Sequence, residues 1–155
     1  MNNKIEYSGI DYIIIGSSVM LTVLAVVYTL LEYSALPDEI PLHFNASGDI
    51  DRYGSKSTLW YVVGILTATT IGLFFMARAT SIHNTQLKTR TANFRSLAMY
   101  MPFLGLMQLI VVYAIIESAK GTFNYSKWIL PTILIITAIF LAITFAFIKK
   151  NKETD

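Results

Sequence analysis

Four long runs without a charged residue are the feature of this sequence that most restricts its fold. Each run is 19 to 21 residues long, and together they make up about half of the chain. An α-helix needs roughly 20 apolar residues to cross the ~30 Å hydrocarbon core of a bilayer. The runs therefore predict four transmembrane segments, at residues 12–31, 59–77, 97–116 and 128–148.

Composition supports a membrane location. Hydrophobic residues make up 54% of the chain and charged residues 14%, with a mean hydropathy of +0.54. Soluble domains are about 45 to 50% apolar and about 25% charged, which excludes an ordinary water-soluble enzyme. Backbone groups in lipid must be satisfied within each segment, which favours helices. We expect an all-α, polytopic membrane protein that forms one domain over residues 1–155, with the lipid bilayer as its main partner.

Lysine and arginine counts predict the orientation. The two tails and the second connection hold eight of these residues, whereas the first and third connections hold four. The positive-inside rule then predicts that both termini and the second connection lie in the cytoplasm. The first run is too long for a signal peptide, so we expect it to be retained. The net charge of +2 forms no clustered basic face, so no nucleic-acid partner is expected.

Small residues predict helix-packing seams. They recur every fourth position in the second and fourth runs, where they form flat stripes that another helix can approach closely. Packing within the chain is favoured, and packing between two chains in an oligomer is the alternative. The stripes consist of Gly64, Ala68 and Gly72, and of Ala138, Ala142 and Ala146.

Two further residues inside the runs predict local structure. Pro102 should kink the third helix or mark its effective start, because proline lacks a backbone donor. Gln108 is the strongly polar side chain at mid-membrane depth, and it predicts an interhelical hydrogen bond, with a polar pathway as the alternative. No ionisable residue lies at mid-depth, which argues against a charge-driven transporter.

The connection between the first two runs carries most of the information about function. It spans residues 32–58 and holds seven of the 22 acidic and basic residues, beside His43. Apolar residues alternate there with prolines and glycines, which argues against disorder. We therefore expect an ordered extracytoplasmic cap that is extended from Ile40 to Phe44, turns at Gly48 and re-enters the membrane at Lys56.

This connection resembles the N-terminal uncharacterised domain of SdpI-type immunity proteins, which carry an L-P-x-x-I-P-x-H-F element followed by Gly, Asp and Ser-Lys. The resemblance implies a multi-pass protein of the bacterial inner membrane that protects against a membrane-active peptide toxin or signals its presence. It also implies a recognition site in the connection. The residues expected in that site are Pro37, Pro41, His43, Phe44, Asn45, Gly48, Asp51 and Lys56.

The same connection leaves other chemistry open. His43, Asp49 and Asp51 provide an imidazole and two carboxylates, a donor set that suits a divalent metal. A membrane hydrolase would combine them, or would pair His43 with Ser47 or Ser55. The simpler interpretation is that these residues cap turns, with no cofactor and no enzyme activity. Lys56 either pairs with Asp51 or extends to the headgroups. A third role is that of an accessory subunit, with a transporter or sensor as its membrane-protein partner.

Overall fold

The computed structural model describes residues 5–83, 87, 89–122 and 128–152, with side chains from 80 to 83 left out. It contains four helical segments that are long and apolar enough to cross a membrane: Gly9–Ala35, Thr58–Ala79, Arg90–Ala119 and Ile129–Asn151. The predicted multi-pass helical membrane protein is therefore confirmed. The elements are α1 (Gly9–Glu32), η1 (Tyr33–Ala35), β1 (Glu39–Phe44), β2 (Ile50–Ser55), α2 (Thr58–His83), α3 (Arg90–Ala98), α4 (Tyr100–Ala119) and α5 (Ile129–Asn151).

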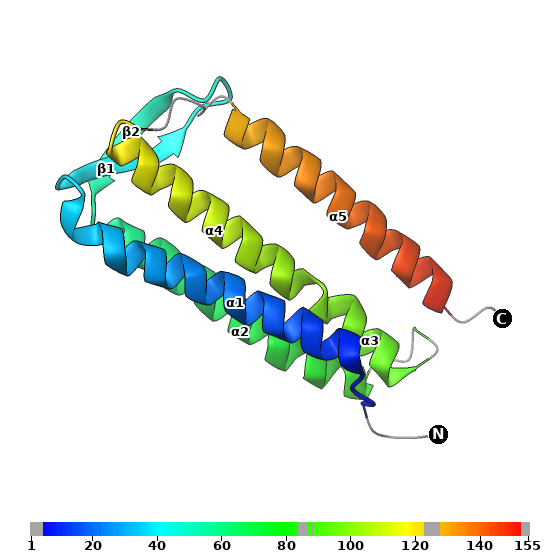
Figure 1. The fold of residues 1–155 in the computed structure, drawn as a ribbon. Helices are drawn as coiled ribbons and strands as arrows, with labels where there is room; N and C mark the ends of the chain where they lie inside the picture. The colour runs from blue at the N-terminus through cyan, green and yellow to red at the C-terminus, as the bar shows by residue number, and fades with distance from the viewer. Residues whose placement is uncertain (1–4, 84–86, 88, 123–127, 153–155) are drawn as a thin grey trace.

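Helices α1, α2 and α4 pack together as a bundle, and α5 runs beside it (Figure 1). The two strands cover one end of the bundle, which we call the hairpin end. The start of α1, helix α3 and the end of α5 lie at the opposite end, which we call the termini end. The main contacts of α5 are with α3 and α4, and most of its side chains are exposed. Such an apolar outer surface suits a helix that faces lipid.

The closest helix contact in the bundle is between α1 and α4. Ser18, Ala25 and Thr29 are buried on α1, and the backbone of Ser18 lies beside Gly105 of α4. The hydroxyls of Ser18 and Thr29 donate to carbonyls of their own helix, at 2.7 and 2.8 Å. Small residues with satisfied hydroxyls allow the two backbones to approach. This seam was not predicted, although Ser18, Ala25 and Thr29 follow helical spacing in the sequence.

The two predicted small-residue seams are wrong as contacts within the chain. Gly64, Ala68 and Gly72 are exposed, and a Cβ built on either glycine would meet nothing within 4 Å. The stripe of Ala138, Ala142 and Ala146 is exposed as well. Spacing identifies a flat helix face, but the partner of that face depends on how the whole bundle is arranged.

The two predictions for single residues of the third segment are confirmed. The amide nitrogen of Gln108 donates to the carbonyl oxygen of Val63 at 3.4 Å and to the hydroxyl of Thr67 at 3.1 Å, so it links α4 to α2. The segment is divided at Met99 into α3 and α4, and Pro102 is the third residue of α4. Proline is tolerated in a first helical turn because the donor that it lacks has no partner there.

Candidate recognition site at the hairpin end

The connection between α1 and α2 contains an antiparallel pair of strands, which the all-α prediction did not include. Glu39 pairs with Ser55, Ile40 with Gly54 and Pro41 with Tyr53. The pairing becomes irregular between Pro41 and Phe44, where the register shifts. Proline cannot donate to a strand ladder and is therefore found at edges and irregularities, which fits Pro41 at this position.

Several apolar residues of the motif attach the hairpin to the bundle. Ile40 and Pro41 are fully buried, and Leu36 is buried beside them. Ile40 and Leu36 belong to one apolar cluster with residues of α2 and α4, among them Leu59 and Ile116. Phe44 is half-buried and Pro37 is exposed. Thus the hydrophobic part of the motif mainly fixes the position of the hairpin.

Asn45, Gly48 and Asp49 form the turn between the strands. The side-chain oxygen of Asn45 accepts from the backbone N–H of Ser47 and of Asp49, both at 2.9 Å. Gly48 has a φ of 85°, a left-handed conformation that favours glycine. Asn45 and Gly48, two of the predicted site residues, therefore shape the backbone of the turn.

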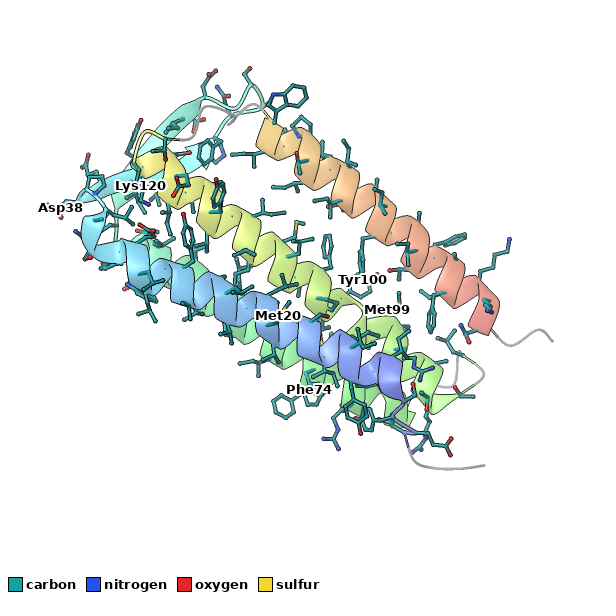
Figure 2. The ribbon with its side chains drawn as sticks, viewed as in Figure 1. Met20, Asp38, Phe74, Met99, Tyr100 and Lys120 are labelled. Atoms are coloured by element: carbon teal, nitrogen blue, oxygen red, sulfur yellow. The ribbon has the colours of Figure 1, made fainter. Side chains whose placement is uncertain are left out.

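Lys56 fixes the base of the hairpin. Its ammonium group donates to the carbonyl oxygen of Leu36 and lies near a carboxylate oxygen of Asp38, both at 3.2 Å. It also lies 5.7 Å from the ring centroid of Tyr33. The predicted alternative of a pair with Asp51 is wrong, since Asp38 is the carboxylate that the fold brings to this lysine. Asp38 is labelled at the outer edge of the hairpin end in Figure 2.

His43 and Asp51 lie side by side on the exposed face. The Nδ1 atom of His43 is 2.5 Å from a carboxylate oxygen of Asp51, and the two side chains are 57% and 46% exposed. Asp49, the third predicted metal ligand, instead lies at the turn with Asn45. Within the described ranges, no group of three His, Cys, Asp or Glu residues is placed to hold a metal ion. The structure therefore brings together two of the three predicted ligands.

The two serines weighed as nucleophiles lie in other contacts. The hydroxyl of Ser55 is 2.9 Å from the hydroxyl of Ser57. The backbone N–H of Ser47 donates to Asn45 in the turn. His43 has its contact with Asp51, so neither serine is shown in the contact that a nucleophile and its base require.

The hairpin carries more negative than positive charge. From Asp38 to Lys56 there are four carboxylates, two basic residues and His43. All four carboxylates and Arg52 are exposed, whereas Lys56 is half-buried. The exposed surface of the hairpin is therefore acidic. Its carboxylates are Asp38, Glu39, Asp49 and Asp51.

A second polar group at this end connects α1 to α4, and the sequence did not reveal it. Lys120 lies 2.6 Å from a carboxylate oxygen of Glu32 and 3.2 Å from one of Glu117 (Figure 2). The hydroxyl of Tyr28 donates to Glu117 at 2.5 Å. The hydrogen bond to Glu32 is the main cause that raises the pKa of Lys120. The spacing of Tyr28 and Glu32, one helical turn apart, was the sequence signal from which a polar group on this face of α1 could have been predicted.

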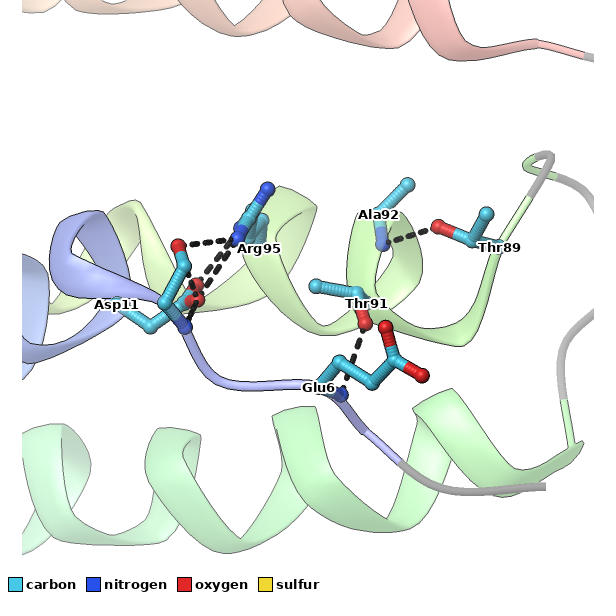
Figure 3. Close-up of polar contacts among 7 residues, drawn as sticks. Glu6, Asp11, Thr89, Thr91, Ala92 and Arg95 are labelled. Atoms are coloured by element: carbon cyan, nitrogen blue, oxygen red, sulfur yellow. Dashed lines mark hydrogen bonds and ion pairs between the residues drawn. The ribbon is translucent and has the colours of Figure 1, made fainter. Parts of the chain in front are cut away.

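The termini end has its own buried ion pair. Asp11 is fully buried, and its two carboxylate oxygens accept from Arg95 at 2.7 and 2.8 Å (Figure 3). The same carboxylate accepts from the backbone N–H of Ser8 at 2.7 Å, and the backbone N–H of Glu6 donates to Thr91. These contacts join the start of α1 to α3, and removing one partner of such a pair is costly.

Comparison with known proteins gives two matches. A family model described as a domain of unknown function, DUF1648, matches residues 20–67, which run from α1 through the hairpin into α2. An uncharacterized protein of Archaeoglobus fulgidus is 28% identical over 122 residues, which cover 77% of this chain. The matched region covers 60% of that protein, so the chain spans less than two thirds of its length. No solved structure matches the chain.

Proposed function

We propose that this membrane protein recognises cationic membrane-active peptides through its acidic hairpin and protects the membrane from them. The observation that carries the proposal is that some residues of the motif are buried against the bundle and others are exposed. Apolar residues such as Ile40 are buried in the bundle, while the carboxylates of the hairpin remain exposed, one of them beside His43. A fixed scaffold that presents an acidic surface suits a cationic partner, because complementary charge speeds encounter and selects the partner.

The sequence resemblance to SdpI-type immunity proteins supports the protective role. Three residues of the motif hold the hairpin in shape: Asn45 and Gly48 form its turn, and Lys56 fixes its base. Fixing the hairpin in advance lowers the entropy lost when a peptide binds. Under this proposal the bundle is a scaffold, and the hairpin together with the adjacent helix ends is the binding face.

The proposal requires the hairpin end to lie outside the cell membrane, with both termini in the cytoplasm. The lysine and arginine distribution supports this orientation. The chain has no cysteine, so single cysteines report topology without background. We expect Ser47→Cys to react with an impermeant maleimide in intact cells, and Lys149→Cys to react only after permeabilisation. The reverse pattern would remove the hairpin from the side where a secreted peptide arrives.

Charge-neutral variants test recognition. A synthetic amphipathic lysine–leucine peptide is the probe, in killing assays on cells that express the protein and in leakage assays on vesicles that contain it. The variant Glu39→Gln/Asp49→Asn/Asp51→Asn keeps the side-chain size and one acceptor oxygen of each group but removes three negative charges. We expect it to lose most of the protection, and Arg52→Gln, which raises the net negative charge, to increase it. Equal protection by all three proteins would contradict the proposal.

A further inference from the structure

A groove separates α5 from α1 and the first half of α4. Its volume is about 560 Å³, within the roughly 300 to 1,000 Å³ typical of ligand sites. Apolar side chains from all three helices form its walls, among them Ile14, Leu106 and Ile139. Met99 and Tyr100 are labelled at the start of α4 in Figure 2, and the ring of Tyr100 contacts that of Phe140 of α5 edge to face, with 4.8 Å between the centroids.

Arg95 is the charged residue that lines this groove, at its termini end. Its Nε and Nη2 atoms donate to Asp11 and Ser8. Among the described residues, no acceptor is paired with its Nη1 atom, and the side chain is 26% exposed. Donors without an acceptor are costly in an apolar environment. The groove therefore offers an apolar wall and, at one end, donors suited to an anion.

The charges around this end add to the attraction for an anion. Basic residues outnumber acidic ones among its described residues, since Glu6 and Asp11 are the acids. Exposed Tyr7 and Tyr12 lie close to Asp11 in the sequence, and tyrosines of this kind favour the headgroup level of a membrane. Because the candidate spans begin or end at this end of the bundle, we expect Arg95 to be near the depth of lipid phosphates. The basic residues are Arg78, Arg90, Arg95, Lys149, Lys150 and Lys152.

We propose that the groove binds an anionic phospholipid of the bilayer. Its phosphate accepts from the Nη1 atom of Arg95, and one acyl chain extends between α1 and α5 along Ile14 and Ile139. A phospholipid satisfies both parts of the site, whereas an apolar helix of a second copy leaves the arginine donors unpaired. Basic pockets between transmembrane helices are known to take acidic headgroups. The bound lipid would also contribute to holding α5 beside the bundle.

The test compares two lipids on the full chain in mild detergent. Dioleoylphosphatidylglycerol and dioleoylphosphatidylcholine are added separately, and native mass spectrometry and melting temperature report binding. We expect the anionic lipid to bind about fivefold more tightly, the preference typical of one basic residue near a membrane surface. The melting temperature should rise accordingly with phosphatidylglycerol, because a ligand that binds the folded state stabilises it.

Three variants locate the site. Asp11→Asn/Arg95→Gln removes the guanidinium without leaving an unpaired buried charge, and it should abolish the preference for phosphatidylglycerol. Ile139→Trp fills the groove and changes none of the ion pairs, so it should lower binding of both lipids even if the first variant is unstable. Arg78→Gln, a basic residue outside the groove lining, should retain the preference. Equal binding of both lipids by the wild type, an unchanged preference in Asp11→Asn/Arg95→Gln, or unchanged binding of both lipids in Ile139→Trp would overturn the proposal.

Discussion

Gly105 of α4 lies so close to Leu21 of α1 that a Cβ atom built on the glycine would be 3.0 Å from the Cβ of Leu21. It would also lie 3.3 Å from the carbonyl oxygen of Ser18. Both neighbours belong to α1, and the second is backbone that cannot move without moving its helix. Close backbone approach is a main source of helix association in lipid. The contact at Gly105 therefore sets the spacing between these two helices.

We expect Gly105→Leu to lower the free energy of unfolding by about 1 to 3 kcal/mol or more, the usual cost of overpacking. Gly105→Ala should have a smaller effect in the same direction. Melting in detergent measures both. Gly64→Leu is the matched control, because a Cβ at Gly64 would meet nothing within 4 Å. Equal destabilisation at the two glycines would show that the α1–α4 seam is not the closest contact.

We expect the stability of the protein to depend strongly on both Asp11 and Arg95. Asp11→Asn leaves the guanidinium without its carboxylate, and Arg95→Gln leaves a fully buried carboxylate uncompensated. We expect each single change to cost about 3 kcal/mol, and the double change Asp11→Asn/Arg95→Gln to cost less than the sum. Thermal unfolding of the four proteins gives the coupling. Asp38→Asn, where the carboxylate is 98% exposed, should change stability by no more than about 0.5 kcal/mol. Additive single effects would contradict a buried, coupled pair.

We expect Ile40 to be a main attachment of the hairpin to the bundle. It is fully buried among residues of α2 and α4, so Ile40→Ala should cost about 2 to 5 kcal/mol through lost burial and a cavity. Hydrogen exchange should rise mainly in β1 and β2, because the hairpin loses its contact with the bundle. Tyr53→Ala, on the exposed face of β2, is the control and should leave exchange in β1 nearly unchanged. Similar exchange in both variants would place the attachment elsewhere.

We expect the stabilisation that Lys120 contributes to depend on pH. Its contact with Glu32 raises its pKa above the usual value of a lysine. The stabilisation it contributes is fully present below the pKa of the unfolded lysine, and it is lost as the pH rises through the higher folded pKa. The difference in melting temperature between wild type and Lys120→Met should therefore stay constant from about pH 7 to 9 and shrink at higher pH. Lys149→Met, in the exposed last turn of α5, is the control. A difference that shrinks below pH 8 would contradict this assignment.

The sequence located the candidate site, but it did not show which residues of the site are buried and which are exposed. The resemblance singled out the residues from Pro37 to Lys56, yet it could not separate Ile40 and Pro41, which are buried, from His43 and Asp51, which are exposed. The residues of the connection also suggested Asp51 as one possible partner of Lys56, where the fold provides Asp38. The choice between two nearby carboxylates depends on the strand register and on the turn at Gly48. Those features follow from the packing of the whole hairpin.

The sequence alone predicts the four crossings, the hydrogen bond of Gln108 and a helix boundary near Pro102. Each of these follows from a local property: an apolar run, a lone polar side chain in lipid, or a missing backbone donor. Which helix faces meet depends on the folded arrangement of the whole chain. It joined Asp11 to Arg95 across 84 positions, packed α1 against Gly105, and left the more regular glycine stripe of α2 exposed. The physical reason is that lipid is as apolar as the side chains, so helix pairing depends on shape and polar contacts between distant segments rather than on hydrophobicity along the chain.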